Sequence, residues 1–176
     1  MKPLSPREQA LKVLKDLKIS DIPIPVEEIA AKLGAKVSYE PFEGKDEISG
    51  MLFRDDDRIV IGINSAHANT RQRFTIAHEI GHLVLHKGAI FVDKSVRLNR
   101  DTKSALAIDP REIDANRFAA ELLMPTEFVT KEAVKRLSKK SKVSEVLLAD
   151  SLASAFEVST HAMEIRLTNL GIITAR

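Results

Sequence analysis

Two histidines and a glutamate lie close together in the segment His78-Glu79-Ile80-Gly81-His82. In an α-helix, residues four positions apart lie on the same side, one turn apart, so both imidazoles can reach a single metal ion. Glu79 lies about 100° around the helix axis from His78, where its carboxylate can act on a water molecule without binding the metal. The spacing H-E-x-x-H therefore predicts a helix that supplies two zinc ligands and a general base.

The residues around this motif favour a largely buried helix. Thr70 can cap its start and Gly88 can end it, and no proline interrupts the segment between them. The side opposite the histidines is apolar, with Ile76, Ile80 and Leu83 grouped together. Burying two histidines and a glutamate is costly unless a partner compensates them, and a divalent metal would do so. A hydrogen-bonded core cluster without metal is the alternative interpretation.

A second predicted helix offers the third metal ligand. Asp109 suits its N-cap, Pro110 its first turn and Pro125 its end. A catalytic zinc site uses three protein ligands, often including a carboxylate, and leaves the fourth position open. At about 100° per residue, Glu112 lies in the middle of the apolar face of this helix. Its inward-facing carboxylate needs a partner, which zinc bound by the two histidines would supply.

The same geometry assigns the other polar residues of this helix. Asn116 follows Glu112 by one turn on the same face, so it is placed to hydrogen-bond a ligand histidine. Asp114 and Glu121 fall near the opposite side and are expected to face solvent. An alternative for Glu112 is a helix-start acid that the helix dipole favours. The zinc ligands predicted from spacing are thus the two motif histidines and Glu112.

Composition excludes several classes of protein. A chain of 176 residues can form one domain with a sizeable core. It has no Cys, which excludes disulfides and thiolate metal sites. We find no signal-peptide pattern and no apolar run approaching the roughly 18 residues of a membrane span, so we expect a cytoplasmic protein with no membrane partner. The net charge of +2 does not by itself indicate nucleic-acid binding.

The remaining pattern predicts an α+β fold, with a small antiparallel sheet packed on a zincin-type helical core and a helical C-terminal extension. Amphipathic helices are expected over residues 5–17 and from Pro25 to Gly34. Strand-like runs follow at residues 35–42, 48–53 and 58–63. The last two runs flank a polar turn and so form a hairpin.

An edge of this sheet would either hold an extended substrate by main-chain pairing or merely cover the motif helix. Residues 88–109 are expected to form a loop with at most a short strand at 90–92, acting as a lid or as a plain connection.

At this point the chain resembles a known family. RQRFTIAHEIGHLVLH, followed further on by E-x-x-A-N-R-F-A-A-E-L-L-M-P, resembles the ImmA/IrrE family of metallo-endopeptidases within the gluzincin group. Ile48-Ser49-Gly50-Met51-Leu52 and Ile63-Asn64-Ser65 also resemble that family, so the resemblance covers residues 20–173. It implies a bacterial or phage zinc peptidase with ligands His78, His82 and Glu112 and the base Glu79. It also implies that the substrate is a helix-turn-helix repressor, cleaved to relieve repression. We expect that repressor to be separately encoded.

The C-terminal part is expected to be a helical extension of a zinc metallopeptidase domain. We place the domain at residues 1–125 and the extension at 126–176. In the extension, a helix from Thr126 to Leu137 is followed by a sequence pattern that resembles a helix-turn-helix. A basic patch precedes the helix-turn-helix-like pattern and consists of Lys135, Arg136, Lys139, Lys140 and Lys142. Arg166 is the only permanently basic residue between Ser159 and Leu170, so we expect protein docking, with direct DNA contact as the alternative.

Two other functions stay open at this level. One is a DNA-associated regulator in which the metal is structural, and the other is a toxin–antitoxin partner that uses the metal domain as a binding module. Glu79 argues against a purely structural metal site, because such a zinc site has no use for a general base. The residue that would stabilise the oxyanion also stays open among His67, His86 and His161.

Overall fold

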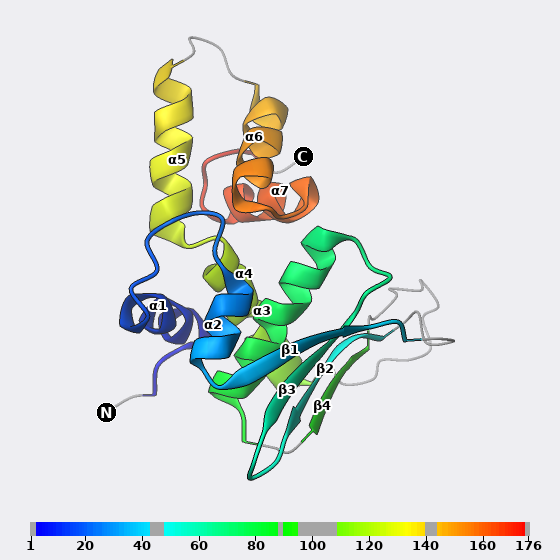
Figure 1. Ribbon diagram of the computed structural model, residues 1–176. Coiled ribbons are helices and arrows are strands. Elements are labelled where there is room, and N and C mark those ends of the chain that lie inside the picture. The colour runs from blue at the N-terminus through cyan, green and yellow to red at the C-terminus, as the bar shows by residue number, and fades with distance from the viewer. Residues whose placement is uncertain (1–2, 43–47, 88–89, 95–108, 140–143, 175–176) are drawn as a thin grey trace.

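The computed structural model describes residues 3–42, 48–87, 90–94, 109–139 and 144–174 (Figure 1). The helices are α1 (Pro6–Asp16), α2 (Val26–Lys32), α3 (Asn69–Leu85), α4 (Pro110–Leu123), α5 (Thr126–Lys139), α6 (Glu145–Phe156) and α7 (Thr160–Asn169). The strands are β1 (Ala35–Glu40), β2 (Ile48–Arg54), β3 (Ile59–Asn64) and β4 (Ile90–Lys94). The α+β fold class predicted from the sequence is confirmed. Within the described part of the chain, no helix combines the length and hydrophobicity that a bilayer span needs.

The sheet is mixed and not purely antiparallel, which corrects the predicted pairing. Its strand order is β1-β3-β2-β4. The hairpin strands β2 and β3 pair antiparallel, as do β2 and β4, whereas β1 pairs with β3 in parallel, with Ala35 opposite Ile59. β1 thus lies at one edge of the sheet beside β3, and β4 lies at the other edge beside β2. The chain reverses twice between β1 and β3, so these two strands run in the same direction.

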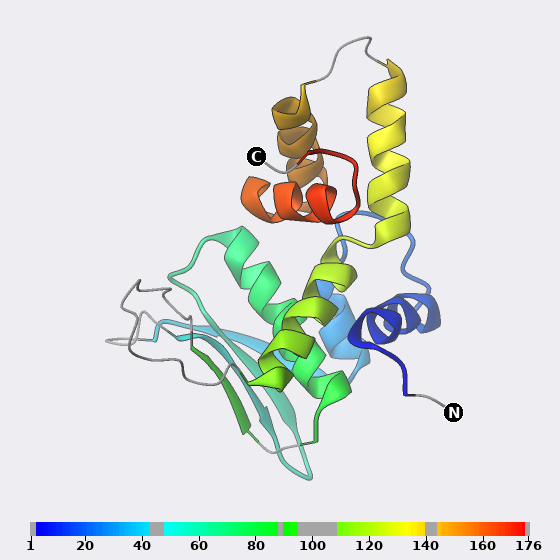
Figure 2. The same ribbon diagram turned by 180° about the vertical axis from the view of Figure 1, so that it is seen from behind.

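Helices cover one face of this sheet, and α3 lies against it (Figures 1 and 2). Gly50 on β2 permits this contact, because a Cβ at that position would clash with the Thr75 methyl group on α3 and lie 3.0 Å from the Gly62 carbonyl oxygen. Apolar side chains from the sheet and the helices form the buried core, which includes Leu52 and Ile80. The helix that carries the H-E-x-x-H motif is therefore held directly against the sheet.

The ends of α3 differ from those expected. The helix begins at Asn69 after Ala68 and has no side-chain cap, so Thr70 does not have the predicted role. It ends at Leu85, before Gly88, which lies outside the described residues. Arg54, the last residue of β2, donates from Nη2 to the Leu83 carbonyl oxygen at 2.9 Å. The hairpin thus satisfies a carbonyl group that the helix end leaves open.

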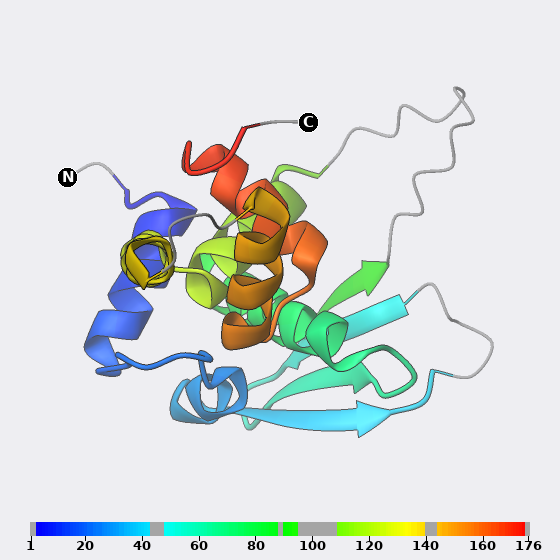
Figure 3. The ribbon, with the colours of Figure 1, turned by 90° about the horizontal axis from the view of Figure 1, so that it is seen from above.

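The helices α6 and α7 lie over α3 and α4 in the view from above (Figure 3). Between them, Glu157 caps α6 in a left-handed conformation with φ of 51°, and Ser159 caps the start of α7. Arg73 on α3 donates to the Glu157 carbonyl oxygen at 3.2 Å and forms an ion pair with the Glu157 carboxylate at 3.3 Å. The same guanidinium donates to the Ile24 carbonyl oxygen at 2.8 Å. Arg73 therefore fixes the α6–α7 turn to α3.

Candidate metal centre

The two motif histidines present one nitrogen each to a common point on α3. His78 and His82 are 2% and 1% exposed, and their Nε2 atoms lie 3.0 Å apart. The two rings meet edge to face, with centroids 4.6 Å apart. The helical spacing of four residues thus brings both imidazoles together as predicted from the sequence.

Glu112 on α4 completes the cluster. Its Oε2 lies 3.1 Å from Nε2 of His78, and its Oε1 lies 3.3 Å from Nε2 of His82. Hydrogen bonds with the two histidines hold the pKa of the Glu112 carboxyl group well below its usual range, although partial burial opposes this shift. The carboxylate is therefore charged at neutral pH and is presented to both imidazoles.

The three donor atoms fit a zinc ion. All of them lie within 4.8 Å of one another, so they form a group that could hold a metal. A tetrahedral zinc site with bonds of about 2.0–2.1 Å has donor atoms separated by about 3.3 Å. Here the two Nε2 atoms lie 3.0 Å apart, and those of His78 and His82 lie 3.1 Å from Oε2 and 3.3 Å from Oε1 of Glu112, respectively. Two imidazoles and one carboxylate are also a donor set that catalytic zinc sites use, and they leave a fourth position open.

Asn116 orients one of the imidazoles. Its Oδ1 lies 3.1 Å from Nδ1 of His78, one turn of α4 beyond Glu112. When Nδ1 of His78 donates its hydrogen to this oxygen, the neutral ring keeps its lone pair on Nε2, which faces the cluster. Asn116 itself is exposed, so its contact with His78 lies at the rim of the site.

Glu79 lies in the contact between α3 and the sheet. Its side chain is 0% exposed, and its Oε1 would lie 3.4 Å from a Cβ at Gly50 on β2. The missing side chain at Gly50 makes room for Thr75 on α3, and the Glu79 carboxylate lies next to this contact. The motif thus places its glutamate in the protein interior, one residue from His78.

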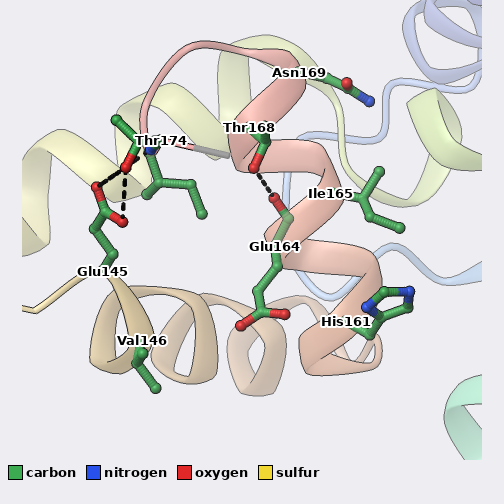
Figure 4. Close-up of a pocket in the computed structure, with 9 residues that line it drawn as sticks. Glu145, Val146, His161, Glu164, Ile165, Thr168, Asn169 and Thr174 are labelled. Atoms are coloured by element: carbon green, nitrogen blue, oxygen red, sulfur yellow. Dashed lines mark hydrogen bonds between the residues drawn. The ribbon is translucent and has the colours of Figure 1, made fainter. Parts of the chain in front are cut away.

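The beginning of α4 is tied to the end of α3. His86 donates from Nε2 to the Arg111 carbonyl oxygen at 3.2 Å, next to Glu112 in the chain. Its ring centroid lies 5.3 Å from that of His82. Among the histidines considered for the oxyanion, His86 is thus beside the cluster, whereas His161 lines a hollow between α6 and α7 (Figure 4).

One prediction for α4 is wrong. Glu121 was expected to face solvent, but it is 2% exposed and pairs with Arg166, which is 4% exposed. The helical-wheel argument assumed that α4 has a single buried side, whereas α3 and α7 contact it on different sides. The sequence does hold a signal for this pair, because Arg166 lies between the apolar residues Met163 and Leu167 on α7. A charge in such a stripe needs a buried partner.

Comparisons with known proteins show which family this chain belongs to. The sequence pattern of the peptidase family described as IrrE N-terminal-like domain matches residues 30–168. The Bacillus phage phi105 protein named "Uncharacterized immunity region protein 2" is 32% identical over 89 residues. That match covers 51% of this chain and 52% of the phage protein, so the chain spans about half the length of this relative. Because the family pattern spans most of the sequence and includes both helices of the cluster, the chain belongs to the ImmA/IrrE family of metallopeptidases.

Proposed function

We propose that this protein is a zinc-dependent endopeptidase that cleaves a separately encoded helix-turn-helix repressor in the cytoplasm and so relieves repression. The convergence of His78, His82 and Glu112 within 4.8 Å is the observation that carries this proposal. Family membership supports a peptidase activity. The immunity region in the name of the phage relative is compatible with a repressor as the substrate.

In the proposed mechanism each residue of the site has one task. The two histidines and Glu112 hold the metal, and Asn116 keeps the His78 ring in the tautomer that presents Nε2. Zinc, when bound, supplies Lewis-acid activation of a water molecule and of the scissile carbonyl group. Glu79 takes the proton of the attacking water on its carboxylate and passes it to the leaving amine, so the proton is conserved over the reaction.

We further propose that residues 1–125 carry the catalytic site and that residues 126–176 help to hold the substrate. The ion pair between Glu121 and Arg166 crosses this boundary, so the extension and the catalytic part act as one unit. DNA reading by α7 has less support, because the guanidinium of Arg166 is buried against α4. Thr160, at the start of α7, is engaged with Asp150 on α6 at 2.8 Å.

The test is cleavage of a helix-turn-helix repressor, chosen by reading the genes next to this one. Purified, zinc-loaded protein is expected to cut that repressor at one site, which mass spectrometry of the fragments would locate. Glu79→Gln should keep the zinc and the fold but lose about a hundredfold or more in cleavage rate, the usual scale for removing a general base. Undiminished cleavage by Glu79→Gln would refute the mechanism. A repressor that stays intact with zinc-loaded protein would refute the proposed substrate.

A further inference from the structure

A groove lies beside the metal cluster, with α7 and the turn before it on one side and α1, α3 and α4 on the other. It consists of two hollows of about 310 Å³ and about 270 Å³ that share Met124 and Ala162. Asn116 lines the first hollow and touches His78. Phe74 lines the second, with its ring centroid 6.4 Å from that of His78. We call this surface the interhelical groove; the wall residues used in the argument are Arg7, Arg71, Phe74, Arg117, Met124 and Ala162.

The interhelical groove is positively charged. Its walls contain four arginines and no aspartate or glutamate. One of the four, Arg166, is buried and forms an ion pair with α4. The other three, Arg7, Arg71 and Arg117, are exposed. Arg117 has the Asp114 carboxylate at 3.8 Å, and none of the ion pairs among the described residues involves Arg7 or Arg71. The groove therefore offers cations to a ligand.

This charge is confined to one side of α7. The hollow between α6 and α7 in Figure 4 has Glu145 and Glu164 on its wall and no lysine or arginine. The whole chain has a net charge of only +2. A positive groove beside the metal cluster is thus a local feature and does not follow from a basic chain.

The floor of the interhelical groove is apolar. Met124 and Val158 are 3% and 7% exposed, and Phe74 is half-buried. Ile165 on α7, at the rim of the first hollow, is 50% exposed. Apolar walls with a few charged groups at the rim suit a peptide that inserts one apolar side chain and carries acids on either side.

We propose that the interhelical groove binds an acidic segment of the protein substrate, with an apolar side chain on Met124 and carboxylates on Arg7, Arg71 and Arg117. This inference rests on the proposed function and specifies its substrate. Because the groove adjoins His78, a segment held there limits which peptide bond can reach the metal cluster. Substrate choice thus depends on a surface outside the catalytic residues.

A nucleic acid is the competing ligand for a cationic groove, but the structure favours a peptide. Nucleic-acid affinity depends on many lysine and arginine contacts to phosphates, whereas this groove offers three exposed arginines and no lysine. Base stacking uses exposed aromatic rings, and Phe74 is the one aromatic residue among those that line the two hollows.

The experiment measures peptide binding in the zinc-loaded Glu79→Gln variant, so that hydrolysis does not interfere. Two fluorescent peptides of equal length are compared by anisotropy, one with leucine flanked by aspartates and glutamates, the other with asparagines and glutamines in their place. The acidic peptide is expected to bind about tenfold more tightly, and higher salt should reduce this difference. Arg7→Glu combined with Arg117→Glu should weaken its binding by about tenfold or more.

The matched control reverses two exposed lysines outside the groove, Lys36→Glu and Lys131→Glu, which changes the net charge by the same amount. It should leave the dissociation constant within about twofold. A milder pair, Arg7→Gln with Arg117→Gln, covers the case in which the double reversal fails to fold. Equal binding of the two peptides, or an equal loss in the lysine control, would overturn the inference. So would a single-stranded oligonucleotide that binds more tightly than the acidic peptide and depends on the same arginines.

A second arm separates this inference from the proposed function. With the neighbouring repressor as substrate, the arginine variants should raise KM about tenfold and leave kcat nearly unchanged, because the catalytic residues are untouched. If the arginine variants cleave the repressor with an unchanged KM, the proposed binding of substrate in the interhelical groove is refuted, whereas the proposed function is not. If the protein binds the acidic peptide selectively but does not cut the repressor, the proposed substrate is refuted, whereas binding of acidic segments in the interhelical groove is supported.

Discussion

Arg166 on α7 donates from Nη2 to Oε2 of Glu121 on α4 at 2.5 Å, with side chains 5% and 3% exposed. The guanidinium also donates to the Met124 carbonyl oxygen at 2.9 Å and to the Thr126 hydroxyl at 3.0 Å. The other oxygen of Glu121 accepts hydrogen bonds from the backbone and the hydroxyl of Thr126, both at 2.9 Å. Hydrogen bonds thus surround both charges, and the network links the C-terminal helices to the helix that carries Glu112.

Arg166→Met is therefore expected to lower the free energy of unfolding by about 3–5 kcal/mol, because Glu121 stays buried without its counter-charge. Adding Glu121→Gln should recover a large part of this loss. Urea denaturation of the single and double variants measures both effects. The exposed Lys131→Met is the control and should change stability by no more than about 0.5 kcal/mol. A single variant as stable as the wild type would contradict the structural importance of the pair.

We expect one zinc ion per chain, lost on substitution of any proposed ligand. His78→Ala, His82→Ala and Glu112→Ala should each remove the metal, because two donors hold zinc much less firmly than three. Asn116→Ala should keep the metal but weaken its affinity by about 10–100-fold. Metal analysis after dialysis against a chelator checks these outcomes, with His161→Ala as a control far from the cluster. Full retention in Glu112→Ala would assign the third ligand to another acid, such as Asp109.

Tyr39 provides a pH-dependent prediction. Partial burial, a hydrogen bond to Glu27 and the charge of that carboxylate raise its pKa from 10.0 to about 12. Because the folded pKa lies above the unfolded one, the contribution of Tyr39 to stability is complete below pH 10 and is lost as the pH rises towards 12. The chain has one tyrosine and no tryptophan, so tyrosinate absorbance reports this group alone. Glu27→Gln should lower the midpoint, and a native midpoint near 10 would contradict the contact.

DNA binding provides a test of the C-terminal helices. We expect no sequence-selective duplex binding near physiological salt, because the one permanent cation between Ser159 and Leu170 is buried. Weak binding at low salt would come from exposed basic side chains and should fade steeply as salt is added. Fluorescence anisotropy at two salt concentrations distinguishes these cases. Selective binding that survives, and that Thr160→Ala or Glu164→Ala abolishes, would favour a DNA-associated regulator.

Much of the fold could be predicted because its signals are local. The cap Asp109 and the two prolines predicted α4 within a few residues, the H-E-x-x-H spacing predicted α3, and strand periodicity predicted the hairpin. Helical geometry also brought Glu112 and Asn116 towards His78, because the residues of one helix face keep fixed angles to one another. That inference needed only the assumption that the two helices pack together.

The errors share a non-local origin. The parallel pairing of β1 with β3 joins two strands that β2 separates in the chain, which no pattern within β1 reveals. The burial of Glu121 depends on α7, which follows it by some forty residues in the chain. At the end of α3, the Leu83 carbonyl oxygen accepts a hydrogen bond from Arg54 of the hairpin. In each case a distant element supplies the partner that local propensity cannot indicate.

The glycine inside the motif has a consequence for the choice of metal. A Cβ at Gly81 would lie 3.1 Å from Cα of Ala115 and 3.3 Å from Cδ1 of Phe118, so α3 and α4 approach until their backbones nearly touch. Two nitrogen donors come from one of these helices and the carboxylate from the other, so the interaxial distance sets the radius of ion that the three can share. Zinc bonds of about 2.0–2.1 Å suit a close approach, whereas calcium, with bonds of about 2.3–2.6 Å, needs a wider cage. We therefore expect Gly81 to favour an ion with short bonds, such as zinc, without being one of its ligands.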